Sequence, residues 1–302
     1  MFLISKLEDY MKDNTYVLIS DSCSDMTPEM IEETDAKIVP MIFRIDENDY
    51  LDYPDDREMS SHDFFERLRN GKRSQTSQIT PSRYIEFIEP FLKDGKDVLL
   101  VVFSSALSST YTSAILAVNS LKEKYPERII DTIDSLAAAG GQGYLVYMLG
   151  LNRNNGMNIE ENKKWGEENK LHVAHWFTID DLMYLKRGGR LSASKAWMGT
   201  LLTLKPILHV DDEGRLVPME TVRGRKQAVI ALMNHFEKTA YDPSKNVVMI
   251  AHADDIATAR FLGEKMKAKF DIPKLIYGNI GPVIGSHTGS NAILLFFMAK
   301  HR

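Results

Sequence analysis

Residues 98–103 are the feature that most restricts the fold of this chain. Their sequence, Val-Leu-Leu-Val-Val-Phe, is apolar at every position, so a strand formed here presents apolar side chains on both faces. Such a strand is typical of the centre of a parallel sheet, where helices cover both faces. The run therefore predicts an α/β fold.

Short β-branched runs alternate with longer helical patterns around this central run. The expected strands lie at 16–20, 37–43, 98–103 and 129–133. The expected helices begin near residues 28, 61, 81, 107 and 137. Thr27-Pro28 and Thr80-Pro81 each combine an N-cap residue with a proline at the first helical position. Alternation of this kind indicates βαβ units and a mainly parallel sheet.

The pattern changes near residues 165–170. Beyond this point the expected strands lie at 172–177, 206–210, 215–221, 247–252 and 275–280, with helices at 224–239 and 256–269. Residues 211–214 join two of these strands as a hairpin, which favours a mixed sheet. We therefore expect two dissimilar α/β domains, a parallel-sheet domain at 1–165 and a mixed-sheet domain at 166–302, with a boundary accurate to about fifteen residues.

Composition excludes several classes of function. The 302 residues are 44% hydrophobic and 26% charged, as in globular proteins, and the net charge of −5 does not favour nucleic acid or an anionic membrane surface. Apolar runs are far shorter than the roughly 20 residues that cross a bilayer, and charges at residues 6–13 leave no signal-peptide core. A single cysteine, Cys23, fits a reducing compartment. We expect a cytoplasmic protein.

Common catalytic signatures are missing from the sequence. There is no P-loop and no nucleophile elbow, and Gly141-Gln142-Gly143 lacks the third glycine of a dinucleotide fingerprint. The histidines, acidic residues and Cys23 are not clustered at metal-ligand spacings. We therefore predict no catalytic residues, no metal and no cofactor.

A hydroxyl-rich segment follows the central strand. Six of the eight side chains from Ser104 to Tyr111 carry hydroxyl groups, beginning with Ser104 and Ser105. In open α/β sheets, ligands bind beyond the carboxyl ends of the strands, and helix N-termini attract anions. Helix capping alone would explain one or two of these hydroxyls. The segment indicates an anion site or a capped helix.

Two further polar segments are candidates for the same site. Thr76 and Ser77 lie in Ser-Gln-Thr-Ser-Gln, which we expect in a loop between helices. His287 and Thr288 lie between Gly285 and Gly289 after an expected strand, so the backbone can approach a ligand closely; the alternative is a glycine-rich turn with an exposed histidine. A histidine ring N–H can donate to a carboxylate. Taken separately, both segments also fit ordinary polar turns.

A cationic segment lies at residues 186–190. Arg187 and Arg190 flank Gly188-Gly189, and arginine binds phosphate or carboxylate through two parallel hydrogen bonds. A solvated charged surface is the simpler interpretation. The segment is therefore a candidate contact for phosphate or for an acidic partner.

Taken together, these segments resemble the DegV family from the first strand almost to the end of the chain. The resemblance rests on seven segments in the right order: Ser20-Asp21-Ser22, Val39-Pro40-Met41, Thr76-Ser77-Gln78, Ser104-Ser105-Ala106-Leu107-Ser108, Tyr184-Leu185-Lys186-Arg187-Gly188-Gly189-Arg190, Leu204-Lys205-Pro206-Ile207-Leu208 and Gly285-Ser286-His287-Thr288-Gly289.

The resemblance implies a DegV-like fold of two dissimilar α/β domains with a long-chain fatty acid bound between them. The residues implied as ligands of its carboxylate are Thr76, Ser77, Ser104, Ser105, His287 and Thr288. Family members present the fatty acid to a separate fatty acid kinase, which makes an acyl phosphate for phospholipid synthesis. Arg187 and Arg190 are then the expected contacts to the kinase or to the transferred phosphate. The role is compatible with transient membrane contact.

The acyl tail must supply most of the affinity, at about 0.8 kcal/mol for each buried methylene. Nine apolar residues of the second half are candidates to line its tunnel: Trp176, Phe177, Leu182, Met183, Trp197, Met198, Leu201, Leu202 and Ile207.

Two other functions remain open from the sequence. One is a hydrolase or phosphotransferase that uses Ser104 or Ser105 with His287, although no acidic residue next to His287 in the sequence is available to orient its ring. The other is a lipid-responsive regulator of a protein partner.

Overall fold

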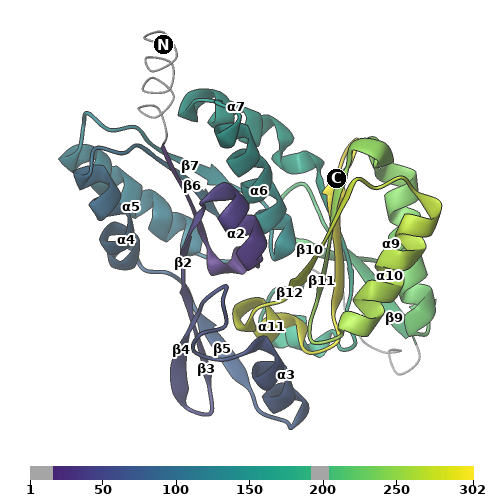
Figure 1. Ribbon diagram of the computed structural model, residues 1–302. Helices are drawn as coiled ribbons and strands as arrows, with labels where there is room; N and C mark the ends of the chain where they lie inside the picture. The colour runs from purple at the N-terminus through teal and green to yellow at the C-terminus, as the bar shows by residue number, and fades with distance from the viewer. Residues whose placement is uncertain (1–15, 192–203) are drawn as a thin grey trace.

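The computed structural model describes residues 16–191 and 204–302. The N-terminal part contains a four-stranded parallel sheet with the strand order β2-β1-β6-β7 (Figure 1). Its strands are β1 (Val17–Asp21), β2 (Lys37–Val39), β6 (Val98–Val102) and β7 (Ile130–Asp134). All five residues of β6 are buried, and β6 pairs with β1 on one side and β7 on the other. The predicted central strand and parallel sheet are confirmed.

Helices cover both faces of this sheet. They are α2 (Pro28–Thr34), α4 (Pro81–Lys93), α5 (Thr110–Lys124), α6 (Gly140–Asn154) and α7 (Ile159–Asn169). Helices α4 and α5 lie on one side, and α6 and α7 lie on the other, with α2 against α6 (Figure 1). The side chains of Thr27 and Thr80 accept hydrogen bonds at the starts of α2 and α4, as the sequence predicted.

A small antiparallel sheet with the order β4-β3-β5 lies below the parallel sheet in Figure 1 and was not expected. Its strands are β3 (Met41–Ile45), β4 (Asn48–Asp52) and β5 (Ser74–Ser77), and helix α3 (Ser61–Arg69) follows β4. The prediction of one strand at 37–43 was wrong, because β2 ends before Pro40, which has no backbone N–H for a strand ladder. The prediction of a loop at 74–78 was also wrong. Its polar residues gave no strand pattern, but they pair with β3.

The C-terminal part contains a six-stranded mixed sheet with the order β10-β9-β8-β13-β11-β12. Its strands are β8 (Val173–Thr178), β9 (Leu204–Val210), β10 (Leu216–Arg223), β11 (Val247–His252), β12 (Lys274–Asn279) and β13 (Ile293–Met298). Strands β11 and β12 pair in parallel and the other neighbours are antiparallel. The predicted hairpin and mixed sheet are confirmed, whereas β13 was not predicted from the sequence.

Helix α6 lies between the two large sheets. Helices α9 (Arg225–Thr239) and α10 (Ile256–Lys269) cover the outer face of the mixed sheet, and α6 packs against its inner face (Figure 1). A Cβ atom at Gly141 would lie 1.9 Å from His175 Nε2, and one at Gly143 would lie 2.2 Å from the carbonyl oxygen of Ser24. Glycine therefore lets α6 approach both parts of the molecule closely.

Two short helices complete the arrangement, α8 (Met183–Arg187) and α11 (Pro282–Thr288). Helix α11 contacts α3, α8 and the small sheet. The alternative of a glycine-rich turn around His287 was wrong, because these residues are helical. Pro282 in the first turn of α11 and Gly289, which follows its last residue with φ 71°, are ordinary signals of a helix start and a helix end. Gly285 inside the helix obscured the helical pattern in the sequence.

Single-turn 3-10 helices occur at Ser22–Ser24, Lys170–His172 and Pro243–Lys245. Within residues 16–191 and 204–302, no helix is long and apolar enough to cross a membrane.

Candidate ligand-binding site

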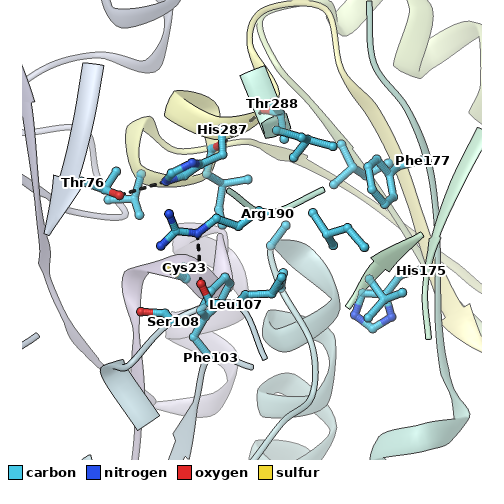
Figure 2. A pocket seen from close by; sticks show the side chains of 18 of the residues that line it. Cys23, Thr76, Phe103, Leu107, Ser108, His175, Phe177, Arg190, His287 and Thr288 are labelled. Atoms are coloured by element: carbon cyan, nitrogen blue, oxygen red, sulfur yellow. Dashed lines mark hydrogen bonds between the residues drawn. The ribbon is translucent and has the colours of Figure 1, made fainter. Parts of the chain in front are cut away.

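An apolar pocket lies between the parallel sheet, the mixed sheet and helix α11 (Figure 2). Its empty volume, including the opening, is about 680 Å³. Most of its lining residues are apolar: Cys23, Met41, Phe103, Leu107, Ala138, Ala139, Phe177, Leu185, Val210, Leu216, Val283, Ile284, Leu294 and Phe296. The polar lining residues are Thr76, Ser108, His175, Arg190, His287 and Thr288.

The parallel sheet contributes the carboxyl ends of its strands to this pocket. Cys23 follows β1, Phe103 follows β6, and Ala139 follows β7 at the start of α6. This is the edge at which open α/β sheets bind ligands. The mixed sheet contributes a face instead of an edge, through Phe177 of β8 and Phe296 of β13. The pocket therefore needs both parts of the chain.

One end of the pocket is polar. Thr76 Oγ1 lies 2.9 Å from His287 Nε2, and both side chains are half-buried (Figure 2). Thr76 belongs to β5 of the small sheet, whereas His287 belongs to α11, so 211 residues separate them in the chain. When an anionic oxygen atom replaces this mutual hydrogen bond, the ring N–H and the hydroxyl can both donate to it.

Arg190 is the cation next to this pair. Its Nε donates a hydrogen bond of 3.0 Å to the carbonyl oxygen of Leu107, which directs the side chain across the pocket (Figure 2). Burial is the main reason that the pKa of His287 is lowered to about 4, and the nearby Arg190 guanidinium lowers it further. The imidazole is therefore neutral at neutral pH, while the arginine keeps its charge.

A second hollow opens directly outside the polar end. It has an empty volume of about 1440 Å³ and shares Thr76, Arg190 and His287 with the apolar pocket. We call it the basic vestibule, because four cationic residues line it and none of its described lining residues is acidic. These cations are Lys72, Arg73, Arg187 and Arg190. An anion at the Thr76–His287 pair would therefore face a positively charged opening.

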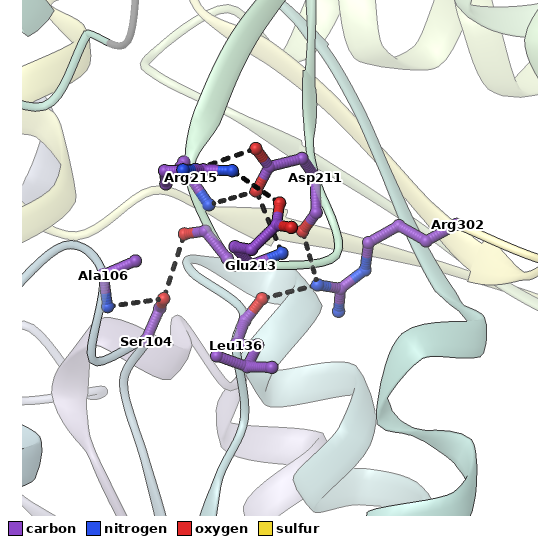
Figure 3. Close-up of polar contacts among 8 residues, drawn as sticks. Ser104, Ala106, Leu136, Asp211, Glu213, Arg215 and Arg302 are labelled. Atoms are coloured by element: carbon purple, nitrogen blue, oxygen red, sulfur yellow. Dashed lines mark hydrogen bonds and ion pairs between the residues drawn. The ribbon is translucent and has the colours of Figure 1, made fainter.

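Ser104 and Ser105 do not line the pocket. Ser104 Oγ donates to the carbonyl oxygen of Gly214 at 2.9 Å and accepts from the Ala106 N–H at 3.3 Å (Figure 3). The hydroxyl thus ties the loop after β6 to the β9–β10 hairpin. Ser105 is exposed, and its N–H donates to Asp134. A serine nucleophile with a histidine base requires a hydrogen bond between the two side chains. Neither Ser104 nor Ser105 forms such a bond with His287 in the described structure.

The remaining predicted carboxylate ligands differ in position. Ser77 is exposed and does not line the pocket, because alternate residues of β5 point to opposite sides. Thr288 does line it, and its hydroxyl donates to a backbone carbonyl oxygen of its own helix. Sequence reasoning missed Ser108 as a lining residue, although it lies in the hydroxyl-rich segment.

The two predicted arginine contacts also differ. Arg187 is exposed, and its guanidinium carbon lies 4.7 Å from the centre of the Tyr184 ring in the basic vestibule. Arg190 is half-buried and belongs to both the pocket and the vestibule. Sequence reasoning did not predict that Arg190 borders the pocket, because the diglycine indicated an exposed loop.

Few of the residues predicted to line a tunnel do so. Phe177 lines the pocket, whereas Trp176 and Ile207 belong to the core beneath α9. Leu182 is buried and Met183 is exposed, and neither lines the pocket. The other four predicted residues, Trp197, Met198, Leu201 and Leu202, lie outside the described residues.

Fold and pocket together define a class of protein. An apolar pocket that ends in a few convergent polar groups is typical of proteins that bind small amphipathic ligands. A family model described as "Uncharacterised protein, DegV family" matches residues 15–300. This chain therefore belongs to the DegV family, as its motifs predicted.

Curated relatives cover nearly the whole chain. The DegV domain-containing protein CPE0026 of Clostridium perfringens is 38% identical over 283 residues, which are 94% of this chain and 97% of the relative. The DegV domain-containing protein SPs1668 of Streptococcus pyogenes is 33% identical over 287 residues, covering 95% and 99%.

Solved structures share the fold. A DegV protein from Bacillus subtilis, described as a fatty acid binding protein, is 28% identical with a TM-score of 0.80 and covers 94% of this chain and 99% of its own. A DegV family protein from Thermus thermophilus, described by its fatty acid binding, is 26% identical with a TM-score of 0.83 and the same coverage.

Proposed function

We propose that this protein binds one long-chain fatty acid, with the carboxylate at Thr76 and His287 and the acyl tail in the apolar pocket. The observation that carries the proposal is the placement of a half-buried hydroxyl–imidazole pair at one end of a mostly apolar pocket. The fatty acid binding described for the relatives from Bacillus subtilis and Thermus thermophilus supports it.

The charges around the pair suit a carboxylate. No acidic residue is among the described lining of the pocket or of the vestibule. Arg190 supplies a positive charge beside His287, and the neutral imidazole supplies a hydrogen bond. A carboxylate that lacked such partners in an apolar site would cost several kcal/mol. The head group thus fixes orientation, and a sixteen-carbon tail contributes roughly 12 kcal/mol before the costs of association.

We further propose that a separate fatty acid kinase reaches the bound carboxylate through the basic vestibule. The vestibule opens onto the Thr76–His287 pair, so the γ-phosphate of ATP, which the carboxylate oxygen attacks as ADP leaves, would approach from this side. Its cations match a triphosphate and the acyl phosphate product. Arg187 is the exposed member and is placed to contact the kinase, whereas Arg190 also borders the carboxylate.

Calorimetric titration of delipidated protein with palmitate, together with native mass spectrometry of the protein as purified, tests the binding proposal. We expect one fatty acid per chain in both measurements. Failure to take up any saturated fatty acid between fourteen and eighteen carbons would overturn it.

A further inference from the structure

A third cavity lies at the N-terminal end of α11, away from His287. In the N-terminal part, its lining residues belong to the segment after β1, the end of β4 and the start of α3. In the C-terminal part, they belong to the ends of β11 and β12 and include Gly281. Its empty volume, including the opening, is about 1150 Å³. It shares no lining residue with the apolar pocket or the basic vestibule.

Acidic side chains dominate the lining of this cavity, which we call the acidic cavity. Its described lining contains no lysine or arginine and five carboxylates: Asp25, Glu29, Asp52, Asp56 and Asp254. Two of these already have partners. Asp254 binds His62 and Arg69 outside the cavity, and Asp56 accepts from the N–H and hydroxyl of Ser61. Asp25, Glu29 and Asp52 form no ion pair with a described residue.

Asp25 and Asp52 converge on the start of α11. Asp25 Oδ1 accepts a hydrogen bond of 3.0 Å from the Gly281 N–H, and Asp52 Oδ2 accepts one of 3.3 Å from the Val283 N–H. A Cβ atom at Gly281 would lie 3.0 to 3.1 Å from three of their four oxygen atoms, so both carboxyl groups crowd around one backbone position. The two acids therefore lie close to each other.

Asp25 has an oxygen atom without a partner. The residue is only 9% exposed, and its Oδ2 forms no hydrogen bond with any described residue. An unpaired buried carboxylate is costly, and a proton or a cation relieves the cost. In agreement, burial and the nearby Asp52 raise the pKa of Asp25 well above its ordinary value, and burial raises the pKa of Asp52 to about 7.

The lining indicates which kind of cation fits. Among residues 16–191 and 204–302, no group of three or more histidine, cysteine or acidic side chains is arranged to hold a metal ion. The cavity is far larger than one ion, and two tyrosines, Tyr53 and Tyr277, line it. An ammonium group carries three N–H donors for carboxylate oxygen atoms, and aromatic rings attract it further.

We propose that the acidic cavity binds a linear aliphatic polyamine, with one ammonium group at Asp25 and Asp52 and another near Glu29 at the exposed rim. The positive charge of the ammonium group relieves the cost of burying the Asp25 carboxylate, one oxygen atom of which has no hydrogen-bond partner among the described residues. Since the site shares no residue with the apolar pocket, the proposal does not depend on the fatty acid function.

Isothermal titration of the full-length protein, with its bound lipid, against spermidine tests the proposal. We expect saturable one-site binding near pH 7 in about 150 mM salt, which screens charge–charge interactions roughly as physiological ionic strength does. Burial raises the pKa of both Asp25 and Asp52 and so favours their protonated forms in the empty cavity; binding of a cation should therefore release protons. The measured heat should therefore change with the ionisation enthalpy of the buffer.

Two variants with the same change in net charge separate site binding from general attraction to an acidic protein. We expect Asp25→Asn to weaken spermidine binding at least tenfold. Asp55→Asn is the matched control, because Asp55 is exposed on the neighbouring loop and paired with Arg57, and it should bind like the wild type. Glu29→Gln changes an exposed side chain that cannot disturb the core, and we expect a loss of about two- to fivefold, of the size of an exposed ion pair.

Three results would overturn the proposal: no saturation at millimolar spermidine, equal binding by Asp25→Asn and Asp55→Asn, or binding of Mg²⁺ or Ca²⁺ that excludes spermidine.

Discussion

The cavities at the two ends of α11 contrast in chemistry. The apolar pocket ends at a neutral histidine beside an arginine, whereas the acidic cavity contains carboxyl groups and no lysine or arginine among its described lining. Burial removes charge in both, because it lowers the pKa of His287 to about 4 and raises that of Asp52 to about 7. At one end Arg190 favours an anion, and at the other end the unpaired oxygen atom of Asp25 favours a proton or a cation.

The largest expected effect is the response of the apolar pocket to the length of the acyl chain. Shortening the ligand from sixteen to ten carbons removes six methylenes, which lowers the binding free energy by about 5 kcal/mol, or between three and four orders of magnitude in affinity. Competition titrations with a series of fatty acids measure it. Spermidine binding serves as the control, since it should not change with the bound acyl chain. An affinity that does not change with chain length would show that the head group, and not the acyl tail, supplies most of the binding free energy.

The next effect is the pH dependence of stability at Asp52. The pKa of this group in the folded protein is about 7, above its unfolded value of 3.8, so folding favours the protonated form. Its contribution is fully present below about pH 4 and is lost as pH rises through 7.

We therefore expect Asp52→Asn to equal the wild type in free energy of unfolding near pH 4 and to exceed it by roughly 2–4 kcal/mol at pH 8. Denaturant unfolding across this range measures the difference, with the exposed Asp94→Asn as control. A difference that stays constant with pH would mean that Asp52 is ionised in the folded protein. The buried histidines titrate in both proteins and cancel in the comparison.

A smaller effect is expected at the polar end of the apolar pocket. His287→Ala removes one hydrogen-bond donor to the carboxylate and leaves Thr76 in place, so we expect palmitate affinity to fall by about 1–3 kcal/mol. His62→Ala changes an exposed histidine near the acidic cavity and should leave palmitate affinity unchanged. Palmitate titrations of both variants provide the measurement. Equal losses in the two would indicate that the carboxylate binds elsewhere.

The smallest expected change in lipid affinity is at Arg187. Because Arg187 is exposed in the basic vestibule and does not line the pocket, Arg187→Ala should retain palmitate while acyl phosphate formation by a fatty acid kinase with ATP falls roughly tenfold. Arg190→Ala should lower both. Arg260→Ala, an exposed change on α10, is the control. Loss of lipid in Arg187→Ala with normal phosphorylation of the remaining bound lipid would move Arg187 into the binding site.

The sequence by itself determined the α/β class, the central strand at 98–103, the hairpin and the family. These depend on signals that are local in the chain, such as alternation of apolar residues, proline at helix starts and polar turns. The sequence also indicated Thr76 and His287 as site residues. It could not show that they face each other, because they are 211 positions apart in the chain.

Only the tertiary structure decided which hydroxyls reach the pocket. Ser104 carried the stronger local signal, but its hydroxyl is used by Gly214, whose position depends on how the hairpin packs on the parallel sheet. The glycine-containing helix α11 forms because Gly285 fits against Phe64 and Phe65, a contact that overrides weak helix propensity. The acidic cavity gave no local signal, since Asp25 and Asp52 become neighbours only through the start of α11. Burial and long-range packing, which no local pattern encodes, therefore determine the chemistry of both cavities.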